Sequence, residues 1–153
     1  MRKLLTLLLL GLVFAANSAF AADPVVGSWV LNVAKSKFTS GPGPKAATRV
    51  YTESDGVYTL NQTMTGSDGK EVPFKVQYRE GQDETVTGAN GIDSIHATKV
   101  NANTWDFSLK SGGKEVGHVH RTISADGKVL TVHNTGRQPS GATGDDTLVF
   151  DKK

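Results

Sequence analysis

Apolar and polar residues alternate along most of the chain after residue 22. In EVPFKVQYR, residues 71–79, every second side chain is apolar, and TWDFSLK, residues 104–110, repeats the pattern. Shorter versions occur at 58–60 and 148–150. A period of two is typical of strands with one buried face, whereas a buried helix needs a period near 3.6. The pattern predicts an all-β domain with little helix.

Turn signals separate these apolar stretches. Asn, Asp and Gly favour hairpin turns because such turns need positive φ. The signals are Asp55-Gly56, Asp68-Gly69, Gly81-Gln82, Asn90-Gly91, Ala102-Asn103, Gly112-Gly113 and Asp126-Gly127. They predict an antiparallel up-and-down meander of about ten strands from Val25 onward, with longer connections at 32–46 and 136–146. We expect the meander to close into a barrel, because closure would remove both sheet edges, and a two-sheet β-sandwich is the alternative.

The first 21 residues have the pattern of a cleaved signal peptide. Arg2 and Lys3 precede an apolar run over 4–16, and Ala19-Phe20-Ala21 is a small-x-small cleavage site. The run is shorter than the about 20 residues that span a bilayer, so no stable membrane insertion is expected. We expect export to the periplasm or the medium, with one domain over 22–153.

Composition narrows the function classes. The chain has no Cys, so neither a disulfide nor a lipidated cysteine can form. Arg2 and Lys3 are two of the 17 basic residues, and the other 15 balance the 15 acidic ones. The basic residues are scattered, whereas nucleic-acid binding needs a basic stripe. Nucleic-acid partners are therefore not expected, and no signal indicates an oligomeric state.

The mature start, VVGSWVLNV, and the last strand, TLVFDKK, together with the meander between them, resemble the calycin superfamily of lipocalins and fatty-acid-binding proteins. The nearest resemblance is to bacterial lipocalin-like proteins. The resemblance implies that Trp29 plugs one end of the barrel and that Gly27 allows close backbone approach. Fatty-acid-binding proteins have a helical lid after the first strand, but here Pro42 and Pro44 exclude a regular helix.

The resemblance also implies a ligand inside the barrel. Fatty-acid-binding proteins clamp a carboxylate with Arg and Tyr on the last strand, where this chain has Leu148 and Phe150. An uncharged apolar molecule is therefore expected, unless Arg121 points inward. The candidate lining residues are Trp29, Tyr58, Phe74, Tyr78, Trp105, Phe107, Arg121, Leu148 and Phe150. A solidly packed barrel with a structural or envelope-stress role is the alternative.

Three histidines are candidate metal or haem ligands. A two-residue turn at Asp126-Gly127 sets His120 opposite His133, with His118 on the same face. Three imidazoles could hold zinc or copper. A two-residue turn at Gly112-Gly113 would set His118 beside Phe107 and His120 beside Trp105. Because these aromatic residues are candidate lining residues, this pairing implies that the histidines point into the barrel.

The opposite face of the two strands that carry the histidines is more apolar, with Val119, Ile123, Leu130 and Val132. Since the more apolar face of a strand is usually the buried one, this pattern favours histidines on the outside of the barrel. An exposed ladder without function is the favoured interpretation.

No motif indicates catalysis. The sequence has no G-x-S-x-G elbow, H-E-x-x-H, P-loop or dinucleotide fingerprint, and it has no Cys nucleophile. We expect a binding protein that is not an enzyme and needs no cofactor.

Overall fold

The computed structural model describes residues 22–153, so the expected signal peptide and its cleavage site lie outside the described residues. The described chain forms ten strands and one 3-10 helix. The strands are β1 (Gly27–Leu31), β2 (Ala46–Ser54), β3 (Val57–Thr65), β4 (Glu71–Tyr78), β5 (Asp83–Thr85), β6 (Ser94–Asn101), β7 (Thr104–Ser111), β8 (Lys114–Ile123), β9 (Val129–Arg137) and β10 (Thr143–Lys152), and the helix is η1 (Val33–Lys35).

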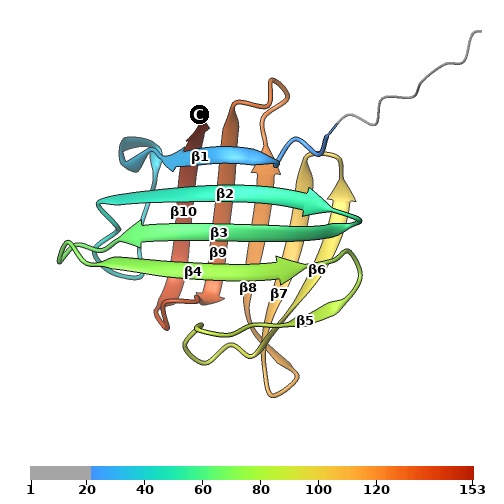
Figure 1. Ribbon diagram of the computed structural model, residues 1–153. Coiled ribbons are helices and arrows are strands. Elements are labelled where there is room, and N and C mark those ends of the chain that lie inside the picture. Colours follow the sequence, from blue (N-terminus) through green and yellow to red (C-terminus); the bar gives the residue numbers. More distant parts are fainter. Residues whose placement is uncertain (1–21) are drawn as a thin grey trace, which may run out of the picture.

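All ten strands belong to one antiparallel sheet. Their order is β4-β3-β2-β1-β10-β9-β8-β7-β6-β5, so every neighbour is also a neighbour in sequence except β1 and β10. In Figure 1 the strands β1 to β4 form one layer that crosses a second layer formed by β6 to β10. The β1–β10 ladder joins the layers into a single sheet. The predicted meander barrel is confirmed, and the sandwich alternative is wrong.

The barrel has one seam. Within residues 22–153, β4 and β5 share no ladder, and an isolated parallel bridge between Glu80 and Ala97 spans the gap. The signals at Gly81-Gln82 and Asn90-Gly91 therefore lie in the connections on either side of β5 and not in tight hairpins. By contrast, Asp55 and Gly56 both have positive φ and close the β2–β3 hairpin.

A β-bulge in the β7–β8 ladder decides which face of the sheet carries His118 and His120. The predicted pairing across Gly112-Gly113 holds at Lys110 with Glu115, but Leu109 then pairs with Gly117. Val116 is the extra residue, and beyond it the register has moved by one position. Such a shift turns every side chain to the other face. Trp105 is therefore opposite Arg121, not His120.

The bulge depends on glycine. Gly117 pairs with Gly136 on β9, and a Cβ at Gly117 would lie 2.2 Å from the Arg137 carbonyl oxygen. Gly136 has a φ of 74°, which residues with side chains rarely adopt. The two backbones approach closely only because neither residue has a side chain.

The segment before β1 folds over one end of the barrel, which we call the closed end. The side chains of Val25 and Trp29 have no exposed surface, and the Trp29 indole donates to the Val25 carbonyl at 2.8 Å. Asp23 accepts hydrogen bonds from Tyr58 Oη at 2.9 Å and Lys99 Nζ at 3.0 Å. These contacts tie the segment to β3 and β6.

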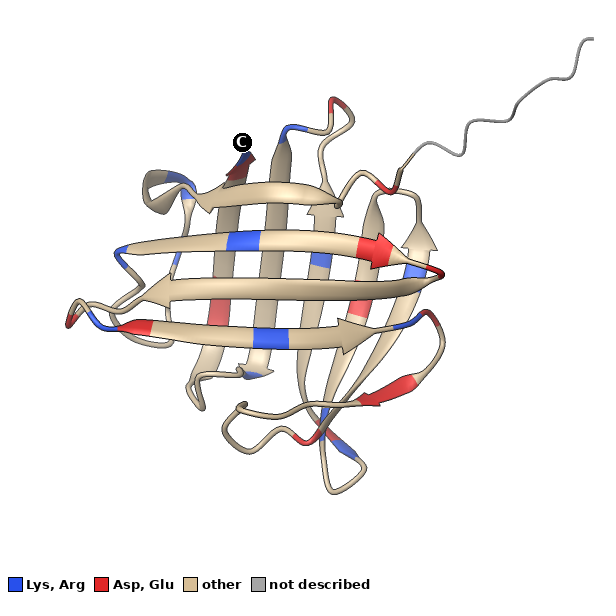
Figure 2. Cartoon of the chain, viewed as in Figure 1, with Lys and Arg blue, Asp and Glu red and all other residues tan. Residues whose placement is uncertain are grey.

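In the described part of the chain, charged residues are spread over both layers and the turns and do not gather into one stripe (Figure 2). Within residues 22–153 no helix has the length and apolar character that a membrane crossing requires.

Candidate functional site

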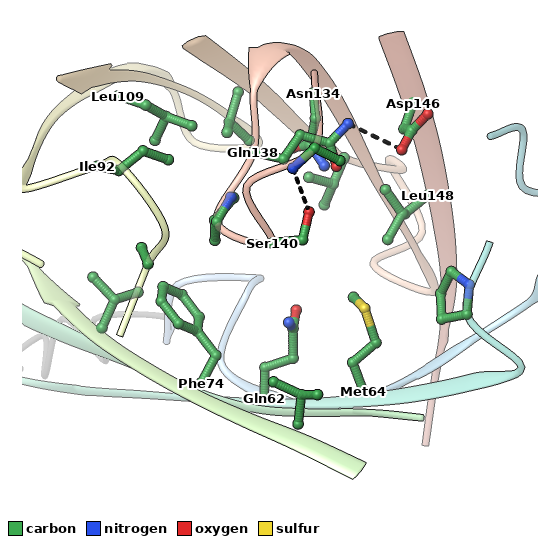
Figure 3. A pocket seen from close by; sticks show the side chains of 18 of the residues that line it. Gln62, Met64, Phe74, Ile92, Leu109, Asn134, Gln138, Ser140, Asp146 and Leu148 are labelled. Atoms are coloured by element: carbon green, nitrogen blue, oxygen red, sulfur yellow. Dashed lines mark hydrogen bonds between the residues drawn. The ribbon is translucent and has the colours of Figure 1, made fainter. Parts of the chain in front are cut away.

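A cavity of about 540 Å³ occupies the barrel interior. Its walls come from both layers: Gln62, Met64 and Phe74 face Leu109, Leu148 and Asn134 across the space in Figure 3. The volume is in the range of sites that take a drug-sized molecule, and most lining side chains are apolar. The barrel can therefore hold a small, largely apolar ligand.

The end opposite the closed end is bordered by loops, and we call it the mouth. Residues 40–44, 88–90 and 138–140 line the cavity there. Asp146, only 4 % exposed, holds the first of these loops. One carboxylate oxygen accepts from the backbone N–H groups of Thr39 (2.6 Å) and Ser40 (3.0 Å). The other accepts from the Ser40 hydroxyl and, at 3.0 Å, from Gln138 Nε2.

These hydrogen bonds set the charge state of Asp146. Burial raises its pKa, but the donors from Ser40, Thr39 and Gln138 outweigh burial and hold the pKa below its ordinary value. The carboxylate is therefore ionised at neutral pH, and the loop over the mouth is fastened to β10 by a charged acceptor.

Arg121 lies deep in the barrel, near the closed end. It is 2 % exposed, and its Nη1 donates to the Tyr78 hydroxyl at 2.6 Å. Its guanidinium carbon lies between 5.2 and 5.6 Å from the ring centres of four aromatic residues, Tyr51, Tyr78, Trp105 and Phe107. Cation–π contact with these rings offsets part of the cost of burying the charge.

The pKa values of both Tyr78 and Arg121 are raised. Burial raises the pKa of Tyr78 to about 12, although Arg121 acts in the opposite direction. Burial lowers the pKa of Arg121, but Tyr78 and Tyr51 outweigh it and the net shift is upward. Arg121 is therefore a fixed positive charge and Tyr78 a neutral phenol at any physiological pH.

Arg49 is a second buried cation that lines the cavity. It is 8 % exposed, and its Nε donates to Gln62 Oε1 at 2.7 Å. Its Nη1 lies 3.4 Å from the Tyr51 hydroxyl, and its guanidinium carbon lies 4.5 Å from the ring centre of Phe150. Arg49 comes from β2 and Arg121 from β8, so both layers contribute positive charge.

Donor capacity in this region is not used up. Arg121 Nη2 and Trp105 Nε1 are buried and have no hydrogen-bond partner in the described part of the chain. Within residues 22–153 neither Arg49 nor Arg121 forms an ion pair with a carboxylate. Buried donors without partners are rare in proteins and call for an explanation such as a missing ligand or water.

The predicted lining residues divide into two groups. Phe74, Tyr78, Phe107, Arg121 and Leu148 line the cavity. Trp29, Tyr58, Trp105 and Phe150 are buried but do not line it. Trp29 and Tyr58 belong to the closed end, whereas Trp105 and Phe150 pack behind the two guanidinium groups.

The three candidate metal ligands lie on the outer face. The side chains of His118, His120 and His133 are 40, 46 and 41 % exposed. His120 pairs across the strands with His133, as the turn predicts, but each imidazole turns to an aspartate. His120 Nδ1 is 2.6 Å from Asp106, and His133 Nε2 is 2.6 Å from Asp145. No group of three or more ligating side chains within residues 22–153 could hold a metal ion.

Sequence reasoning missed Arg49, Gln62 and Asp146. Arg49 could have been found, because it alternates with Ala47 and Tyr51 on the buried face of β2. A charged residue at an inward position of a strand is itself a signal of function. Asp146 carried the same signal, because it alternates with Leu148 and Phe150 on the buried face of β10, but its partners Thr39 and Ser40 are far away in sequence and could not be predicted.

Comparisons with known proteins identify the fold. No family model and no curated protein matches the sequence. Among solved structures, the fluorescent protein UnaG matches with a TM-score of 0.60 and 16% identity, covering 84% of this chain and 96% of that chain. A Schistosoma mansoni fatty acid binding protein in complex with arachidonic acid matches with a TM-score of 0.61 and 12% identity, covering 85% and 96%.

A third structure, As-p18, is an extracellular fatty acid binding protein, with a TM-score of 0.59 and 12% identity over 86% of this chain and 97% of that chain. At these identities the similarity establishes the antiparallel β-barrel fold alone. The named structures are two fatty acid binding proteins and a fluorescent protein.

Proposed function

We propose that the chain is an exported, non-catalytic binding protein for a small, largely apolar molecule that carries an acidic group. The observation that carries the proposal is Arg121, a buried cation at the inner end of an apolar cavity with one unpartnered nitrogen. A bound anion would accept from that nitrogen, while the apolar part of the ligand would extend toward Phe74, Leu109 and the mouth.

The acidic group revises the expectation of an uncharged ligand. That expectation rested on Leu148 and Phe150, and it allowed a carboxylate only if Arg121 points inward. Arg121 does point inward, as does Arg49. The fatty-acid-binding proteins among the structural neighbours support the revised ligand class.

Export and the lipocalin-like branch are also part of the proposal. Export rests on the signal-peptide pattern of residues 1–21, and the branch rests on Gly27 and Trp29 before the meander. Amino-terminal sequencing of protein from the envelope or the medium should begin at Ala22. A start at Met1 in the cytosol would contradict export.

Displacement of an environment-sensitive apolar dye tests the binding function. Hexadecanoate should displace the dye at a concentration about tenfold or more lower than hexadecan-1-ol, because a hydrogen bond to a charged group is worth about 1.5–3 kcal/mol. R121M should remove this difference, and R79M, which changes an exposed arginine, should keep it. Equal displacement by acid and alcohol would contradict the acidic group. Absence of any dye binding would favour a packed structural barrel.

A further inference from the structure

The two buried guanidinium groups lie against the same tyrosine. Arg49 Nη1 is 3.4 Å from the hydroxyl of Tyr51, and the Arg121 guanidinium carbon is 5.3 Å from the centre of its ring. Tyr51 is itself 2 % exposed and lines the cavity. The two cations therefore share one compartment of the barrel and do not serve separate ends of a ligand.

The compartment carries two positive charges, and no described carboxylate forms an ion pair with either of them. Two carboxylates with little exposed surface are already engaged: Asp23 pairs with Lys99 at the closed end, and Asp146 binds the loop at the mouth. Burial of a charge is costly unless it is paired, and two like charges in one compartment add to the cost. A single carboxylate would neutralise only half of this charge.

Both guanidinium groups keep hydrogen-bonding capacity in the cavity that they line. Among the described residues Arg121 Nη2 has no partner, and Arg49 Nη1 has only the tyrosine hydroxyl at 3.4 Å. A phosphate monoester offers three acceptor oxygens with a charge of about −1.5 to −2, and a vicinal dicarboxylate offers four oxygens with a charge near −2. Either head group matches both the charge and the donors.

We infer that the ligand has a doubly charged head group bound between Arg49 and Arg121, on an apolar body that fills the rest of the cavity. This inference rests on the proposed function and specifies its ligand. Arg121 supplies the inner contact and Arg49 the second one, with Tyr51 between them.

Four amphiphiles whose alkyl chains differ by at most one carbon test the inference at pH 8: hexadecyl phosphate, hexadecylsuccinate, hexadecanoate and hexadecan-1-ol. Each displaces an apolar dye from the tag-free protein of residues 22–153. At least one of the two dianions should bind about tenfold or more tighter than hexadecanoate, because the second charge adds charge-assisted hydrogen bonds. Which dianion binds tighter separates a phosphate head from a dicarboxylate head.

Variants of Arg49 locate the second charge. R49M should abolish the advantage of the dianions over hexadecanoate and change hexadecanoate binding less than about threefold. R49K keeps the charge but loses the planar fork, so it should keep part of the advantage. R79M is the matched control on an exposed arginine and should bind like the wild type. Circular dichroism checks the fold, and R49K provides the comparison if R49M does not fold.

The outcomes are distinct. If no dianion binds tighter than hexadecanoate, or if R49M weakens hexadecanoate as much as the dianions, both arginines serve one carboxylate and the inference is overturned while the proposed function stands. If no amphiphile displaces the dye, the proposed function fails together with it.

Discussion

The hydroxyl of Tyr78 on β4 accepts a hydrogen bond from Arg121 Nη1 on β8 at 2.6 Å. The two strands are far apart in the sheet order, so this bond crosses the barrel interior from one layer to the other. It also provides the one hydrogen bond that the Arg121 guanidinium makes within residues 22–153. The proposed anion site and the contact between the two layers therefore share Arg121.

Removal of the Tyr78 hydroxyl should destabilise the ligand-free protein. In Y78F the guanidinium of Arg121 stays buried and loses its partner, which costs about 1–3 kcal/mol in the free energy of unfolding. Y51F is the control, because its hydroxyl is 3.4 Å from Arg49 and makes a weaker bond. Urea unfolding measures both variants, and an equal or larger loss in Y51F would contradict the importance of the cross-barrel bond.

The two tryptophans should differ in how they tolerate phenylalanine. Both are almost fully buried, but Trp29 Nε1 donates to the Val25 carbonyl, whereas Trp105 Nε1 has no partner among residues 22–153. W29F leaves a buried carbonyl without its donor, whereas W105F removes an unsatisfied donor. W29F should therefore lower the free energy of unfolding by about 1–3 kcal/mol more than W105F. The reverse order would show that the closed end is not held by the indole bond.

Close backbone approach at the β-bulge should make alanine costly. In G117A the new Cβ meets the backbone of Arg137, which cannot move aside as a flexible side chain does. A loss of about 1–3 kcal/mol is expected from overpacking. K114A, at the exposed start of the same strand, should change stability by less than about 0.5 kcal/mol. Thermal unfolding of the pair tests this, and equal melting temperatures would be inconsistent with a glycine requirement.

The hold of Asp146 on the mouth loop should depend on pH. Its pKa in the folded protein is below the ordinary value of 3.8, so its contribution to stability is fully present above that value. The contribution is lost as pH falls through the lower, folded pKa. The difference in unfolding free energy between wild type and D146N should therefore be largest near neutral pH and shrink below pH 3.8.

Hydrogen exchange gives a local measure of the same contact. The amides of Thr39 and Ser40 donate to Asp146, so D146N should speed their exchange at neutral pH. The Ile123 amide, which donates to the Asn103 carbonyl far from the mouth, should exchange at an unchanged rate. Unchanged protection of Thr39 and Ser40 would mean that the loop is held by other contacts.

Local pattern was sufficient for the fold but not for the site. Alternation and turn signals predict the ten strands, and the turn at Asp126-Gly127 predicts the pairing of His120 with His133. The register beyond Val116 could not be predicted, because a bulge depends on the close approach of Gly117 to Gly136 from another strand. Arg49 was predictable from its alternation with Tyr51, whereas the partners of Asp146 depend on how the sheet closes.

The seam leaves β4 and β5 as the two edge strands of the sheet. Edge strands can pair with other chains, because a row of their N–H and C=O groups has no partner. Here β5 is only three residues long, while β4 contains Pro73, which has no N–H to donate, and the exposed charge of Lys75. These are the devices by which natural sheets resist edge-to-edge aggregation. The barrel can therefore stay open along one side, and so keep room inside, without offering that side as a template for fibrils.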